Sequence, residues 1–152
     1  VRIQAVREIL QVVPTTPLPL MPAFVRGVMN LRGAVVPVVD LGARLALAAT
    51  DVGRRTCVVI VDVPAADGGR AQTLGLLVDA VYEVFDAPVA EQESVPRLGT
   101  RIDPSFIRSM VRVRGESTAE LDLSAILDQQ LLARLISAHA ADPLAEPFAM
   151  QA

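Results

Sequence analysis

The chain has 152 residues, of which 52% are hydrophobic but only 3% aromatic, and its formal net charge is −3. This length fits one domain, or two small subdomains that share a core. The scarcity of aromatic rings and the lack of a Lys/Arg block argue against a nucleic-acid partner, which needs basic surfaces and stacking platforms. No apolar run is clean and long enough for insertion into a membrane. With one cysteine, Cys57, and one histidine, His139, we predict no metal site and no cofactor.

Residues 1–10 place apolar side chains at a helical spacing. This pattern predicts either a short amphipathic helix or an irregular segment that passes into a strand. Four prolines between residues 14 and 22 then exclude both a helix and a central strand. Because Pro22 suits the first position of a helix, a short helix is expected over residues 23–26.

The most informative stretch is residues 27–41, in which two apolar runs flank the dipeptide Arg32-Gly33. A two-residue break with glycine second predicts a tight β-hairpin, because Gly33 adopts positive φ without steric cost. The turn places Arg32 at the tip, where its guanidinium is either simply solvated or available to a partner. Asp40 is expected to cap a brief helix over residues 41–47.

A second hairpin follows the first. Residues 56–63 form a continuous β-branched run, residues 64–70 are rich in Pro, Asp and Gly, and residues 72–78 return as the partner strand. Residues 81–85 alternate apolar and polar side chains, which predicts a further strand whose register is open.

The last third of the chain opens at Asp103, a good N-cap before a proline. In chain order we expect a helical turn over 105–108, strands over 110–113 and 118–123, a helix over 125–139 capped by Ser124, and a flexible tail over 140–152. Many short strands, tight turns and brief helices favour an all-β fold of small barrels over a parallel sheet.

Catalytic residues are not predicted. The chain has no phosphate-binding loop, nucleophile elbow or zinc-protease motif. Its carboxylates near strand ends are expected to serve as caps and in turns, and an enzyme would need two of them in one deep pocket. These carboxylates are Asp40, Asp62, Asp79, Glu83, Asp86 and Asp122.

The sequence closely resembles the CheW family of bacterial chemotaxis coupling proteins. The residues that carry the resemblance span nearly the whole chain: 6–9 (VREI), 22–28 (PAFVRGV), 30–33 (NLRG), 36–41 (VPVVDL), 75–81 (GLLVDAV), 83–84 (EV), 102–104 (IDP), 106–107 (FI) and 121–123 (LDL). The combination of NLRG with VPVVDL is specific, and the other matches follow in order.

The resemblance implies a CheW-like domain over residues 1–139, followed by the tail 140–152. Its implied fold is two SH3-like β-barrel subdomains that share a core, plus a C-terminal helix. Its implied function is a non-catalytic adaptor, cytoplasmic and located at membrane-associated receptor arrays. Such an adaptor links the cytoplasmic tip of chemoreceptors to the regulatory domain of a CheA-type histidine kinase, and it grips the receptor in a groove between the barrels.

The resemblance also marks candidate partner-binding residues. Val6, Glu8 and Arg32 match family positions tied to receptor or kinase contact, and Asn30 and Leu31 precede Arg32 in the same motif. Four further positions match places where a change impairs coupling, and they are Gly27, Gly75, Val81 and Val84. The two valines are equally compatible with a core and an interface, and the two glycines with a tight backbone. Glu8 is a candidate ion-pair partner.

Family members usually begin with a further strand that enters a barrel, and this chain starts after it. Either such a strand completes the barrel, or a barrel edge is open and would allow self-association with another chain. Residues 117–120 are also less apolar than the family pattern. The alternatives to a chemotaxis adaptor are an SH3-like peptide-binding module in another system, and a CheW-like domain of a larger chemosensory or pilus-motility protein.

Overall fold

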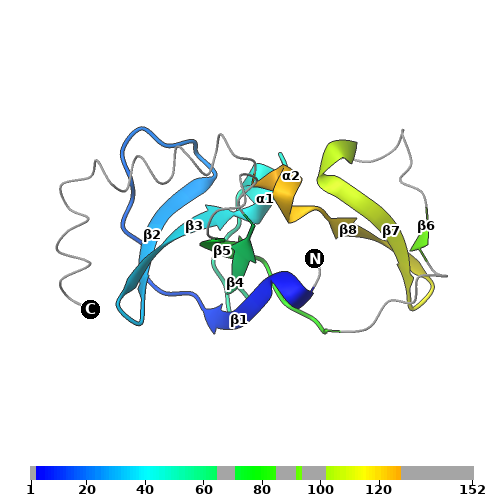
Figure 1. The fold of residues 1–152 in the computed structure, drawn as a ribbon, viewed down its shortest axis with the longest axis horizontal. Helices are drawn as coiled ribbons and strands as arrows, with labels where there is room; N and C mark the ends of the chain where they lie inside the picture. The colour runs from blue at the N-terminus through cyan, green and yellow to red at the C-terminus, as the bar shows by residue number, and fades with distance from the viewer. Residues whose placement is uncertain (1–2, 65–70, 85–91, 94–101, 128–152) are drawn as a thin grey trace.

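The computed structural model describes residues 3–64, 71–84, 92–93 and 102–127 (Figure 1). Its strands are β1 (Val6–Gln11), β2 (Val25–Leu31), β3 (Ala34–Asp40), β4 (Cys57–Val63), β5 (Gln72–Val78), β6 (Gln92–Glu93), β7 (Ile107–Val113) and β8 (Glu116–Leu121). Its helical elements are the 3-10 turns η1 (Ile3–Ala5) and η3 (Pro104–Phe106) and the single turns α1 (Leu41–Arg44) and α2 (Leu123–Ile126). The predicted all-β fold with short helices is confirmed.

The strands form two sheets. One has five strands in the order β1-β4-β5-β3-β2, and the other has three in the order β6-β7-β8. Within the described residues both sheets are open rather than closed barrels, and their arrangement remains consistent with an SH3-like fold. Figure 1 shows the sheets side by side along the long axis, with α1 and α2 between them.

The two faces of the five-stranded sheet bury separate apolar clusters. Side chains alternate across a strand, so on β3 Val39 faces one cluster and its neighbour Val38 the other. We call the first the shared core, because Leu123 and Ile126 of α2 join it from the second sheet's side. The second, the inner cluster, lies within the five-stranded sheet and includes Met29. The two subdomains therefore share a core, as the resemblance implies.

The hairpin at the centre of the sequence forms as predicted. Strands β2 and β3 pair antiparallel around Arg32-Gly33, and the predicted strand 72–78 coincides with β5. Asp40 caps α1 by accepting a hydrogen bond from the Ala43 N–H at 3.2 Å, although α1 ends at Arg44 and not at residue 47.

The predicted helix over residues 23–26 is wrong. Pro22 instead opens a turn in which the Val25 N–H donates to the Pro22 carbonyl at 3.0 Å. From Val25 the chain is strand, because it pairs with Val39 on β3, and the Asp40 N–H donates to the Phe24 carbonyl at 2.7 Å. Strand pairing thus overrides a local helix signal. For residues 1–10 the sequence left a helix and a segment that passes into a strand as alternatives. The structure has the second, because β1 pairs with β4.

After residue 80 the observed elements also differ from those predicted from the sequence. No strand forms over residues 81–84, and Phe85 lies outside the described residues. The helical turn expected over 105–108 is η3, and its C-cap Ile107 already begins β7.

Helix α2 begins after Asp122, whose carboxylate accepts from the Ser124 N–H, so Ser124 is not its cap. It ends at Ile126. The remainder of the expected helix to residue 139 and the expected tail lie outside the described residues.

Candidate functional site

The hairpin tip holds its arginine in a defined direction. Arg32 has φ of 50° and Gly33 of 86°, both in the left-handed region required by a two-residue hairpin turn. The Gly33 N–H donates to the Asn30 side-chain oxygen at 3.0 Å. Asn30, a predicted contact residue, therefore also stabilises the turn that presents Arg32.

Arg32 forms a bidentate ion pair with Glu8 on β1. Its Nη1 lies 2.6 Å from Oε2 of Glu8 and its Nη2 lies 2.8 Å from Oε1. The hydrogen bond from Arg32 lowers the pKa of Glu8, although partial burial opposes this, and the charges of Arg32 and Arg7 act in the same direction. The same hydrogen bond raises the pKa of Arg32. Arg32 and Glu8, which the sequence analysis names as candidate contacts for another protein, therefore bind each other in this chain.

A hollow of about 390 Å³ opens beside this pair. Its walls come from β1, from the tip of the β2–β3 hairpin and from the start of β5, and they include Arg7, Glu8, Leu31 and Arg32. Leu31 is half-buried and packs against the inner cluster. The hollow therefore combines charged side chains with an apolar floor.

The two glycines named as candidates are both buried. Gly27 has φ of +131°, and a Cβ there would overlap the Thr16 carbonyl oxygen, because the segment before β2 bridges to Val28 at this point. A Cβ on Gly75 would lie 2.9 Å from Cγ1 of Val58 in the inner cluster. Gly27 therefore requires glycine for backbone geometry, whereas at Gly75 the constraint is packing against the Val58 side chain.

The three candidate valines differ in placement. Val6 on β1 is half-buried and packs against the shared core. Val81 and Val84 lie on the segment after β5, with 38% and 62% of their surface exposed, and Tyr82 between them is 85% exposed. We call Val81, Tyr82 and Val84 the apolar patch. Its exposure favours an interface over a core for the two valines.

A second arginine tip supports the apolar patch. Arg114 and Gly115 join β7 to β8 with φ of 51° and 82°, close to the values at the first tip. Nη2 of Arg114 lies 2.6 Å from Oε2 of Glu83, which belongs to the same segment as the patch. Residues 81–84 (VYEV) also repeat the pattern of residues 6–9 (VREI). Each of the two Arg-Gly hairpin tips thus binds a Val-x-Glu segment, on β1 for the first tip and after β5 for the second, a repeat that the sequence analysis missed.

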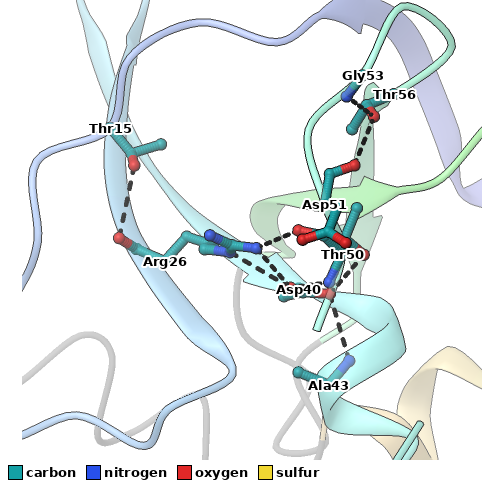
Figure 2. A network of polar contacts seen from close by, with 8 residues as sticks. All are labelled: Thr15, Arg26, Asp40, Ala43, Thr50, Asp51, Gly53 and Thr56. Carbon is teal, nitrogen blue, oxygen red and sulfur yellow. Dashed lines mark hydrogen bonds and ion pairs between the residues drawn. The ribbon is translucent and has the colours of Figure 1, made fainter. Parts of the chain in front are cut away.

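An ion pair between half-buried Arg26 and buried Asp40 links the base of the first hairpin to a loop (Figure 2). Nη2 of Arg26 lies 3.0 Å from Oδ2 of Asp40, and the Thr50 N–H and hydroxyl donate to the same carboxylate at 2.9 and 2.8 Å. Asp40 is only 1% exposed. Burial alone would raise its pKa, but these hydrogen bonds, with those from Ala43 and Arg26, bring the pKa below its usual value. Sequence reasoning identified Asp40 as a cap but missed Arg26 and Thr50.

A second hollow lies between the sheets, with a volume of about 330 Å³. Ala5 and Asp62 line it from the five-stranded side, and Arg108, Leu121 and Leu123 from the other. Within the described ranges no group of three or more His, Cys, Asp or Glu side chains is placed to hold a metal ion. In the same part of the chain no helix has the length and apolarity to cross a membrane.

Two open sheets on one shared core, each with an arginine hairpin tip beside exposed residues, define a small all-β interaction module. The family model of the CheW-like domain matches residues 1–131. The chain therefore belongs to the CheW-like domain family, as the sequence resemblance predicts.

Named relatives agree with this assignment. The chain is 34% identical over 130 residues to "Chemotaxis protein CheW" of Rhizobium meliloti (strain 1021), covering 86% of this chain and 80% of that protein. It is 29% identical over 115 residues to "Chemotaxis protein CheW" of Bacillus subtilis (strain 168), covering 76% and 70%. Among solved structures, the crystal structure of the scaffolding protein TtCheW from Thermoanaerobacter tengcongensis matches with a TM-score of 0.73 and 28% identity over 85% of this chain and 79% of that one.

Proposed function

We propose that this chain is a non-catalytic adaptor that couples chemoreceptors to a CheA-type histidine kinase at cytoplasmic, membrane-associated receptor arrays. The observation that carries the proposal is the presence of two separate exposed regions on one shared core. Figure 1 shows the β2–β3 and β7–β8 hairpins at opposite ends of the long axis. An adaptor needs such an arrangement, because two partners must bind at once without overlapping.

The apolar patch is the proposed contact for the kinase regulatory domain. Exposed Val and Tyr side chains beside a charged pair have the composition of an interface with an apolar centre and a polar rim. The family resemblance links both valines to coupling. The Arg114–Glu83 pair supports the patch by holding its segment against the second sheet.

The hollow between the sheets is the proposed contact for the receptor tip. Apolar Leu121 and Leu123 lie there with Asp62 and Arg108, so the walls suit a helical hairpin with mixed apolar and charged side chains. The Arg32 end is a further contact surface, since 71% of the arginine side chain stays exposed while it binds Glu8.

Binding of a CheA regulatory domain and of a receptor cytoplasmic fragment, each measured by calorimetry, tests this proposal. We expect both to bind, and Arg32→Glu to weaken binding while the circular dichroism spectrum stays unchanged. Arg54→Glu in the exposed loop before β4 is the matched surface-charge control. If neither partner binds the unaltered chain, the proposal is overturned and a peptide-binding module in another system gains support.

Self-association is a second candidate property. β1 is an edge strand of the five-stranded sheet, and Ile9 on it is 42% exposed. Among the described strands β1 pairs on one side only, and such an edge with an exposed aliphatic side chain favours pairing between copies. We expect Ile9→Lys to shift any concentration-dependent dimer to monomer in sedimentation velocity, and a chain that is monomeric at all concentrations would contradict this.

A further inference from the structure

Arg44, the last residue of α1, lies between two aromatic rings that come from different parts of the chain. Its guanidinium carbon is 5.1 Å from the ring centre of Phe24 and 4.8 Å from that of Phe106. Phe24 precedes β2 in the five-stranded sheet, whereas Phe106 belongs to η3, which leads into β7 of the other sheet. One cation therefore contacts a ring from each subdomain.

The same side chain also binds the backbone of the second subdomain. Nε of Arg44 donates to the carbonyl of Ile126 at 2.8 Å. Ile126 is the last residue of α2, where carbonyls lack partners within the helix and carry partial negative charge. Figure 1 shows α1 and α2 next to each other between the sheets. We call Arg44, Phe24, Phe106 and the Ile126 carbonyl the clasp.

The clasp lies at the margin of the shared core, against which both phenylalanines pack. Apolar contact is non-directional, so the shared core opposes separation of the sheets more strongly than it opposes rotation. A planar guanidinium between two rings, with a hydrogen bond in its plane, is directional. Within the described contacts, the clasp is therefore well suited to fix the angle between the sheets.

We propose that Arg44 is a positioning residue that sets the angle between the two sheets, and with it the width of the hollow that both sheets line. The geometric part rests only on the clasp. The part that concerns partners rests on the proposed adaptor function. Arg44 does not line the hollow, so its effect on the receptor tip is expected through the angle between the sheets, whereas the apolar patch, which belongs to one side only, should keep its affinity for the kinase regulatory domain.

Spin-label distance measurements test the geometric part. Ala34→Cys on β3 and Glu116→Cys on β8 are exposed positions, one in each sheet, and Cys57→Ser removes the native thiol. We expect a narrow distribution of distances between the two labels when Arg44 is present. The distribution should be broad or shifted in Arg44→Ala and intermediate in Arg44→Lys. Lysine keeps the charge but loses the planar contact. Identical distributions for Arg44 and Arg44→Ala would overturn the proposal.

Binding measurements with a matched destabilised variant test the partner part. Val58→Ala removes a methyl pair from the inner cluster, away from the clasp, and Arg54→Ala removes an exposed arginine elsewhere. We expect Arg44→Ala to weaken binding of the receptor fragment about tenfold, with less than about twofold loss for the kinase regulatory domain. Val58→Ala and Arg54→Ala are expected to leave the binding of both partners unchanged.

The outcomes separate the two proposals. Equal losses in the binding of the receptor fragment and of the kinase regulatory domain would overturn the positioning role, because general destabilisation acts on both. If the label distances respond to Arg44→Ala but the unaltered chain binds neither partner, the clasp stands and the adaptor function fails. If both partners bind and Arg44→Ala changes neither the distances nor the binding of the receptor fragment, the adaptor function stands and the clasp fails.

Discussion

Arg32 and Glu8 pair across the two edges of the five-stranded sheet. Glu8 lies on β1 and Arg32 directly follows β2, and these are the first and last strands in the sheet order. No strand pairing joins β1 to β2 in the described sheet. The ion pair therefore links the two edge strands, while the Thr16–Val28 bridge joins β2 to the segment that follows β1. The residue proposed as a partner contact thus also ties the two edges of the sheet together.

Exchanging the charges of Glu8 and Arg32 separates the contribution of the ion pair to stability from the proposed contact of Arg32 with a partner. In Glu8→Arg/Arg32→Glu the ion pair can re-form with reversed polarity, so we expect thermal stability close to that of the unaltered chain and above that of either single variant. Partner binding is expected to stay weak, because the exposed guanidinium is gone from the tip. Calorimetric unfolding and binding on all four proteins check this. Recovery of binding in the double variant would show that Arg32 acts only through the fold.

Stability is expected to fall at acid pH through Asp40. Its pKa is lowered in the folded state, so its carboxylate contributes stability above the unfolded pKa, and that contribution is lost as the pH falls through the folded pKa. Asp40→Asn should cost roughly 2–3 kcal/mol near pH 7, because Arg26 and the Thr50 donors lose a charged acceptor. It should also flatten the acid branch of the stability curve.

Urea unfolding between neutral and acid pH measures this effect. Asp51→Asn is the control, since Asp51 is exposed and its backbone carbonyl, not its carboxylate, takes part in the contacts of Figure 2. A loss at neutral pH as small as that of the control would contradict the role assigned to Asp40.

Gly75→Ala is expected to destabilise the chain by about 1–3 kcal/mol through overpacking. The added Cβ would meet Cγ1 of Val58 at 2.9 Å, and this neighbour is a side chain that can be shortened. Val58→Ala in the same chain should therefore recover part of the loss, and a double-mutant cycle by urea unfolding measures the coupling. Additive losses would show that the two sites do not compete for space.

The stability lost in Gly27→Ala should not be recovered by shortening a neighbouring side chain. There the positive φ and the Thr16 backbone both oppose a side chain. Both glycine variants are expected to impair coupling by loss of fold, and partner binding should recover with stability in Gly75→Ala/Val58→Ala.

Val84→Glu tests the apolar patch. A carboxylate at the centre of an apolar interface is costly to desolvate, so we expect roughly tenfold weaker binding of the kinase regulatory domain. The melting temperature should stay unchanged, because the side chain is 62% exposed in the free chain. Val52→Glu, at a valine with 60% exposure in a loop of the other subdomain, is the matched control. Equal effects of the two changes would remove the patch as a contact.

Local signals in the sequence determined the elements that depend on few neighbours. The Arg32-Gly33 turn, the caps at Asp40 and Asp103, and the strand 72–78 follow from positive φ, side-chain acceptors and β-branched runs, and the structure confirms them. The all-β class and the family resemblance were likewise readable, because both rest on local patterns in order along the chain.

Tertiary structure decided what depends on distant pairing. Val25 and Arg26 are strand and not helix because β3 supplies hydrogen bonds, and Arg26 meets Asp40 only once the hairpin has closed. The partners of Arg32, Arg44 and Arg114 lie 24, 82 and 31 residues away. Side-chain spacing along a chain carries no information on such contacts, because the packing of the two sheets brings them together.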